Sequence, residues 1–161
     1  MNHESGRKRP AVVKVLIATM VIFTVMGFAS ALGLLLSPSG KGMGLSLDLL
    51  ENTPLGDFTM VGLFFLAFYG VLPALATYGL LTKKRWRWTD VINRWTGQHW
   101  AWTASAAVGV ILFLWIALEI ALLGVLSGIG FVLQVAMTAL GAWILALAMV
   151  PSVRSSMKLE S

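Results

Sequence analysis

The sequence predicts an all-α integral membrane protein, a bundle of four helices that each cross the bilayer. The chain has 161 residues, 58% of them apolar and 12% charged, which is far more apolar than ordinary soluble domains. A transmembrane helix needs about 20 apolar residues to cross a hydrocarbon core ~30 Å thick. Four stretches satisfy this length, and they lie at 11–36, 58–82, 102–125 and 129–150. They lack the apolar–polar alternation of barrel strands, so we expect helices.

The positions of the basic residues predict the orientation. If the chain crosses four times, eleven of its twelve Lys and Arg residues fall on one side, and only Lys41 falls on the other. Loops rich in these residues stay in the cytoplasm during insertion. We therefore expect a multi-pass plasma-membrane protein with both termini and the 83–101 connection in the cytoplasm. The eleven residues are Arg7, Lys8, Arg9, Lys14, Lys83, Lys84, Arg85, Arg87, Arg94, Arg154 and Lys158.

A single transmembrane domain, residues 11–150, is expected between an N-terminal tail (1–10) and a C-terminal tail (151–161). The basic start and Ala29-Ser30-Ala31 also resemble a signal peptide with its cleavage site. The apolar run before that site is longer than the usual ~7–15 residues, and apolar residues resume after it. We therefore expect the first helix to be retained.

Proline and glycine residues predict the ends of the first helix and a kink in the second. Pro10 suits the start of the first helix, and Ser37-Pro38-Ser39-Gly40 should end it before a Gly/Pro-rich outer loop at 37–57. In the second helix, Pro73 removes a backbone hydrogen bond and frees a carbonyl near residue 69. We expect a helix kink at Pro73, and a fixed bend is favoured over a moving hinge.

Small residues four positions apart occur in two of the predicted helices. Gly27 and Ala31 form such a pair in the first helix, and Ser105 and Gly109 form one in the third. In lipid, where helices associate by packing, this spacing allows another helix to approach closely. These faces offer packing surfaces for helices of the same chain or of a partner.

The basic cytoplasmic connection is rich in tryptophan. Indole rings favour the headgroup layer, which accommodates both an apolar face and an N–H group, so we expect these tryptophans to anchor the connection at the interface. Thr89 is expected to cap a short helix that Gly97 ends. Basic residues interleaved with aromatics also occur in single-strand nucleic-acid binders, but the adjoining spans favour anchoring. The predicted anchors are Trp86, Trp88, Trp95, Trp100 and Trp102.

The third and fourth helices should form a tight hairpin around 125–130, which brings two polar residues to the same level. Glu119 is the one acid inside an apolar span, and an ionised carboxylate at membrane depth is costly. It lies as far before the hairpin midpoint as Gln134 lies after it. We therefore expect the two side chains to face each other about two turns below the outer surface.

Three interpretations of this intramembrane polar pair stay open. In the favoured one, a protonated Glu119 hydrogen-bonds to Gln134 across the hairpin and acts as a structural clamp, because burial in a low dielectric favours the neutral carboxyl group. In the second, Glu119 couples proton or substrate movement. In the third, it contacts a partner subunit.

Other chemistry has little support in the sequence. The chain has no cysteine, which excludes disulfides, thiolate metal sites and Cys nucleophiles. His3 and His99 both lie outside the predicted spans, and no cluster of His, Asp and Glu has metal-ligand spacing. Ser30 and Ser105 have no nearby base. We expect no enzymatic activity, no metal or other cofactor and no nucleic-acid partner, and the sequence identifies no small-molecule ligand.

The sequence resembles a group of uncharacterised small bacterial membrane proteins with four predicted spans. Most of the chain carries the resemblance, through LLLSPSGKGMGLSLDLLENTPLGDFTMVG, YGVLPALATYGLL, HWAWTASAAVGV, LFLWIALEIALLG and FVLQVAMTALG. What it implies is the four-helix architecture and a recurring polar pair corresponding to Glu119 and Gln134. It implies no activity.

We therefore expect a non-enzymatic accessory, assembly or scaffold component that contacts the lipid bilayer and a membrane-protein partner or a second copy. The alternative is a small proton-coupled exporter using Glu119, since the chain looks like the small multidrug transporters in its four helices, single membrane glutamate and many aromatics. Two features depart from that family. Its glutamate is in the first helix, and its weak charge bias differs from the strong one here.

Overall fold

The computed structural model describes residues 9–158, except for the side chain of Trp88, and this part of the chain is helical and has no β-strand. Four spans are long and apolar enough to cross a membrane, which confirms the predicted number. Three are single helices, namely α1 (Ala11–Leu36), α5 (Trp100–Leu123) and α6 (Ile129–Met149). The fourth is a continuous run of α2 (Thr59–Phe65), a π-helical turn η3 (Leu66–Val71) and α3 (Leu72–Thr82).

Short helices occupy the connections between the spans. They are η1 (Lys41–Met43), η2 (Leu47–Leu50), η4 (Arg87–Thr89), α4 (Asp90–Thr96) and α7 (Pro151–Ser156). The predicted N-terminal tail lies outside the described residues except for its last two positions, and so do residues 159–161.

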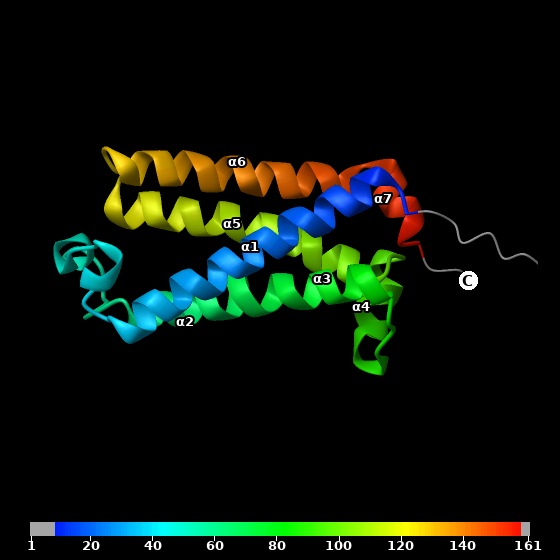
Figure 1. Ribbon diagram of the computed structural model, residues 1–161, viewed down its shortest axis with the longest axis horizontal. Helices are drawn as coiled ribbons and strands as arrows, with labels where there is room; N and C mark the ends of the chain where they lie inside the picture. Colours follow the sequence, from blue (N-terminus) through cyan, green and yellow to red (C-terminus); the bar gives the residue numbers. More distant parts are fainter. Residues whose placement is uncertain (1–8, 159–161) are drawn as a thin grey trace, which may run out of the picture.

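The spans form one bundle, in which α5 and α6 run side by side as a helical hairpin (Figure 1). Helix α1 crosses the bundle obliquely, and the α2–η3–α3 run packs against α1 and α5. The outer loop and the α5–α6 turn lie at one end, which we call the loop end (residues 37–58 and 124–128). Helices α4 and α7 lie at the other, the connector end (residues 83–99 and 150–158).

The two ends carry opposite charge. Of the basic residues that the structure describes, Lys41 alone belongs to the loop end, together with Asp48, Glu51 and Asp57. The remaining ones lie in or next to the connector end, and the Arg9 guanidinium there donates a hydrogen bond to the Leu81 carbonyl. The bundle therefore places the separated basic segments of the sequence beside one another.

Apolar side chains cover both the inside and the outside of the bundle. Phe23, Leu112 and Ile144 pack between the helices and are at most 1% exposed. The outward residues Ile22 and Leu114 are equally apolar, yet they are 62% and 64% exposed. A helix that is apolar all round needs an apolar surrounding, which a bilayer supplies.

The second span changes helix type directly before Pro73, where the sequence predicted a kink. The Leu72 N–H donates to the carbonyl of Ala67, five residues back instead of four. Proline has no N–H, so the carbonyl of Tyr69 lacks its usual partner four residues on. A π-helical turn redistributes the backbone hydrogen bonds around such an interruption.

Gly27 brings α1 directly against this turn. A Cβ atom at Gly27 would lie 2.0 Å from the Tyr69 carbonyl oxygen, which is well inside van der Waals contact. Gly109 has a similar role in α5, since a Cβ atom there would lie 3.0 Å from the Gly141 carbonyl oxygen of α6. Ala31 and Ser105 are fully buried beside them. Both predicted small-residue faces are therefore used inside the bundle.

The described part of the predicted C-terminal tail, residues 151–158, packs against the bundle. Pro151 starts α7, which turns under the connector end, and Val153 and Met157 are buried. The backbone N–H of His99 donates to the Met157 carbonyl at 2.8 Å. The apolar residues of this segment are few, but they fall on the one face that the bundle covers.

Replacing Gly27 with Ala should destabilise the bundle. Alanine is the better helix former, yet its Cβ atom would force α1 away from η3, and overpacking of this kind costs about 1–3 kcal/mol. Gly56→Ala is the control, because no atom lies within 4 Å of a Cβ there. Thermal unfolding in mild detergent, followed by circular dichroism, should show a lower midpoint for Gly27→Ala alone. Equal midpoints would contradict the close approach.

Candidate functional site

The structure brings Glu119 and Gln134 together across the α5–α6 hairpin. The Gln134 amide nitrogen, Nε2, donates to Glu119 Oε1 at 3.1 Å. The other carboxylate oxygen, Oε2, accepts from the indole Nε1 of Trp115 at 3.1 Å. Trp115 lies one turn before Glu119 on α5, so its N–H reaches along the helix surface. Both oxygens of the acid therefore have N–H donors.

The Gln134 side chain also closes the loop between the helices. Its Nε2 donates a second hydrogen bond to the Gly124 carbonyl at 3.3 Å, and its Oε1 accepts from the Leu126 N–H at 3.1 Å. Gly124 takes the first position after α5, where the last carbonyls of a helix lack internal partners. One amide therefore joins α6 to the acid, to the end of α5 and to the loop.

These contacts determine which way the amide points. A backbone carbonyl requires a donor and a backbone N–H requires an acceptor, so Nε2 must face Gly124 and Oε1 must face Leu126. Gln134 then donates to Glu119, and the bond needs no proton on the carboxyl group. The predicted neutral state of Glu119 stays a prediction.

The pair lies closer to the helix ends than the sequence suggested. Helix α5 ends at Leu123, before the predicted 125, because the backbone of Gly124 leaves the helix with φ of 77°. Glu119 is therefore about one turn, roughly 6 Å, from the end of its helix. Gln134 is 4% exposed and Glu119 is half-buried.

Trp115 connects the pair to a cluster of aromatic rings in the core. Its ring stacks on Phe64 with centroids 4.5 Å apart and meets Phe65 edge-on at 5.3 Å. Phe65 in turn stacks on Tyr69 of the π-helical turn at 4.7 Å. Offset and edge-to-face contacts of this kind add to the burial energy. They hold the Trp115 indole in the position from which it reaches Glu119.

Tyr69 has an unusual environment. It is 3% exposed, and its hydroxyl group has no hydrogen-bond partner among the described residues. The hydroxyl also lies within electrostatic range of Glu119. A buried hydroxyl without a hydrogen-bond partner costs free energy, and such a group calls for an explanation.

Two of the five predicted interface anchors are core residues instead. Trp100 and Trp102 are 4% and 9% exposed, so they cannot present their rings to lipid headgroups. Trp100 Nε1 donates to the Lys84 carbonyl at 2.9 Å, and Trp102 Nε1 donates to the Ala148 carbonyl at 2.7 Å. Buried indoles need such partners, and backbone carbonyls at the connector end supply them.

The other three predicted anchors differ from one another. Trp95 on α4 is 93% exposed, as an anchor requires. Trp86 is half-buried, and its ring stacks between Tyr78 and Trp100. The side chain of Trp88 lies outside what the structure describes.

The predicted cap at Thr89 is wrong. Thr89 is fully buried, and its hydroxyl donates back to the Trp86 carbonyl at 2.7 Å instead of capping α4. The backbone turn at η4 places this carbonyl within reach and the N–H groups of α4 out of reach. Gly97, with φ of 65°, ends α4 as predicted.

His99 caps α5 and was not singled out by the sequence. Its Nδ1 accepts from the Ala101 N–H at 3.3 Å, and the residue is 5% exposed. Burial lowers the pKa of His99, the nearby carbonyls of Lys83 and Lys84 oppose this shift, and the positive charges of Arg85 and Lys83 reinforce it. Its position directly before an apolar run was the available signal, although histidine is an uncommon N-cap residue.

Within residues 9–158, no three His, Asp or Glu side chains converge in a way that could hold a metal ion. A scan of known protein families and searches of characterised proteins and solved structures found no match to this chain. The class that the structure supports is therefore an all-helical protein with four helices able to span a membrane.

Replacing Gln134 with Leu should destabilise the hairpin. The change removes the side-chain partner of the Gly124 carbonyl and of the Leu126 N–H, and each lost hydrogen bond costs about 0.5–1.5 kcal/mol. Thr138→Val, one turn further along α6, removes only a hydroxyl that bonds to its own helix and serves as the control. Titration from mild detergent into dodecyl sulfate should unfold Gln134→Leu first. Coincident curves would argue against a clamp.

The connector end should lose stability in acid through His99. Because its folded pKa is below the ordinary value of 6.5, the unfolded chain takes up this proton first. The stability that neutral His99 contributes is fully present above pH 6.5 and is lost as the pH falls through the lowered pKa of the folded state. His99→Asn keeps an acceptor at the N-cap but does not titrate there. Thermal midpoints measured from pH 8 to 5 should fall less for His99→Asn; parallel profiles would exclude His99 as the cause.

Proposed function

We propose that this chain is a multi-pass protein of the plasma membrane with a non-enzymatic role, as an accessory, assembly or scaffold component. The connector end would face the cytoplasm, with both termini. The charge difference between the two ends supports this orientation, because basic segments are retained on the cytoplasmic side. The exposed apolar surface of the spans supports contact with lipid.

One observation carries the proposed role: the hydrogen bonds of Glu119 and Gln134 are directed at the protein itself. Both carboxylate oxygens accept from neighbouring side chains, and the amide holds the loop that joins α5 to α6. An acid engaged in this way stabilises a hairpin. A carrier acid, by contrast, has to release its partners during each cycle.

The burial of the small-residue faces limits where a partner could bind. Gly27, Ala31, Ser105 and Gly109 are buried within the bundle, so these small-residue faces are not open to another chain. The outward surface of α6 carries large apolar residues that are about half exposed, including Phe131, Val132 and Leu133. We infer that a membrane-protein partner or a second copy would pack there, in competition with lipid.

A small proton-coupled exporter using Glu119 is the second candidate. It is favoured by the unpartnered Tyr69 hydroxyl near Glu119, and by the π-helical turn that carries Tyr69, because such turns are frequent at functional sites. Protonation of Glu119 would then change the hydrogen bonds that Trp115 and Gln134 make to it.

Glu119→Gln separates the two roles. A scaffold should keep its fold and its complex, because a glutamine still offers a carbonyl oxygen to one donor. Mass measurement after purification in mild detergent should then give the same stoichiometric assembly for both proteins, with Gln134→Leu as the variant that breaks the hairpin. In proteoliposomes, neither protein should support dye efflux driven by a pH gradient. Efflux by the native chain that Glu119→Gln abolishes would overturn the scaffold role and establish the exporter.

A further inference from the structure

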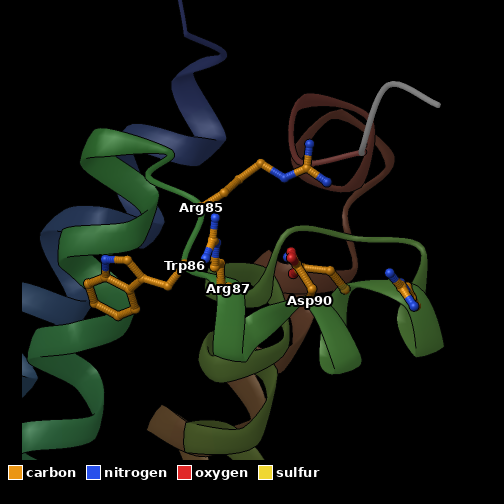
Figure 2. A pocket seen from close by; sticks show the side chains of 6 residues that line it. Arg85, Trp86, Arg87 and Asp90 are labelled. Atoms are coloured by element: carbon orange, nitrogen blue, oxygen red, sulfur yellow. The ribbon is translucent and has the colours of Figure 1, made fainter.

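The connector end contains a pocket that the proposed role does not use. Its volume is about 430 Å³, which is within the range of small-ligand sites. Three arginines, one acid, one amide and one indole line it (Figure 2), namely Arg85, Arg87, Arg94, Asp90, Asn93 and Trp86. We propose that this pocket binds the phosphate group of a phosphate ester, either an anionic phospholipid headgroup or a soluble compound. The phosphate site does not depend on the proposed role, and its lipid source rests on the proposed orientation in the membrane.

The charge of the pocket is uncompensated. Its three guanidinium groups face one carboxylate, and none of them makes an ion pair within the part of the chain that the structure describes. One oxygen of that carboxylate, Asp90 Oδ1, accepts from the Asn93 amide at 3.4 Å within the pocket wall. Guanidinium groups donate planar pairs of N–H bonds that match phosphate oxygens. In Figure 2 the side chains of Arg85 and Arg87 and the carboxylate of Asp90 surround one opening.

Buried groups hold the pocket wall in place. Asn93 is 1% exposed and contacts the fully buried Thr89, whose hydroxyl is bonded to the Trp86 carbonyl. The Trp86 ring turns away from the opening and stacks on Trp100 at 4.8 Å. The backbone that carries the arginines is therefore fixed before any ligand arrives, which lowers the entropy cost of binding.

Two acceptors restrict the ligand further. The Asn93 Oδ1 atom is buried and has no hydrogen-bond partner among the described residues, and the Asp90 carboxylate lies beside it. A phosphate ester that carries its own hydroxyl groups would satisfy both the arginines and these acceptors. A glycerol phosphate headgroup has this chemistry, whereas a choline headgroup has no N–H or O–H donor.

The position of the pocket favours the lipid source. Helix α4, which supplies three of its residues, exposes Val91 and Trp95 at 76% and 93%. Exposed tryptophan on a short helix is typical of the headgroup layer, which is where lipid phosphates lie. Basic residues on the cytoplasmic side also attract anionic lipids.

The test counts lipids bound to the full-length protein by native mass spectrometry in detergent. Phosphatidylglycerol is titrated against phosphatidylcholine, and glycerol phosphate is added as a soluble competitor. The pocket variant is Arg85→Gln/Arg87→Gln/Arg94→Gln. The matched control, Lys14→Gln/Lys84→Gln/Lys158→Gln, removes the same charge from positions that do not line the pocket.

We expect one phosphatidylglycerol to bind saturably and in preference to phosphatidylcholine. The pocket variant should weaken it about tenfold more than the control does, because it alone removes the charge-assisted hydrogen bonds. Failure of glycerol phosphate to compete would assign the site to lipid, and effective competition would assign it to a soluble ester. Equal weakening by the two variants, or no preference over phosphatidylcholine, would overturn the proposal. Matching thermal midpoints for the two variants show that a difference in binding is not a folding defect.

Discussion

The amide of Gln134 links α5, α6 and the loop between them, and α1 and α3 pack against this hairpin. Backbone groups at a helix end and in the turn after it have no partner within the helix, and a side chain can supply one. Gln134 does this for the Gly124 carbonyl and the Leu126 N–H while it holds Glu119. A polar residue in the span is therefore explained by the turn that it closes. The same amide and the Trp115 indole donate hydrogen bonds to Glu119, which lowers the cost of placing its carboxylate in the span.

At the connector end, other side chains supply partners for backbone groups at the helix ends. The indole N–H groups of Trp100 and Trp102 bond to backbone carbonyls, His99 caps α5, and α7 packs against the ends of α1 and α6. These contacts join segments of the connector end that are far apart in the chain. The arginine-lined pocket lies next to these contacts, and Trp86, which lines it, stacks on Trp100.

The two candidate sites lie at opposite ends of the bundle and differ in character. Near the loop end, a single acid is surrounded by donors and aromatic rings that consume its hydrogen bonds. At the connector end, three arginines share a pocket with too little negative charge to neutralise them. In the first arrangement both oxygens of the acid already have donors, whereas in the second the guanidinium groups outnumber the single carboxylate. The proposed clamp and the proposed phosphate site would therefore lie at opposite ends of the bundle.

The four spans, their charge separation and the meeting of Glu119 with Gln134 could be predicted from the sequence, because they follow from hydropathy, from charge and from symmetry about a short turn. The exposure of each tryptophan could not, since Trp95 and Trp100 are five residues apart and differ in what packs on them. The tertiary structure decided this exposure, and also the docking of α7, the bond from Trp115 to the acid and the convergence of the three arginines. These features depend on contacts between segments that are distant in the chain, and such contacts cannot be predicted from the local composition.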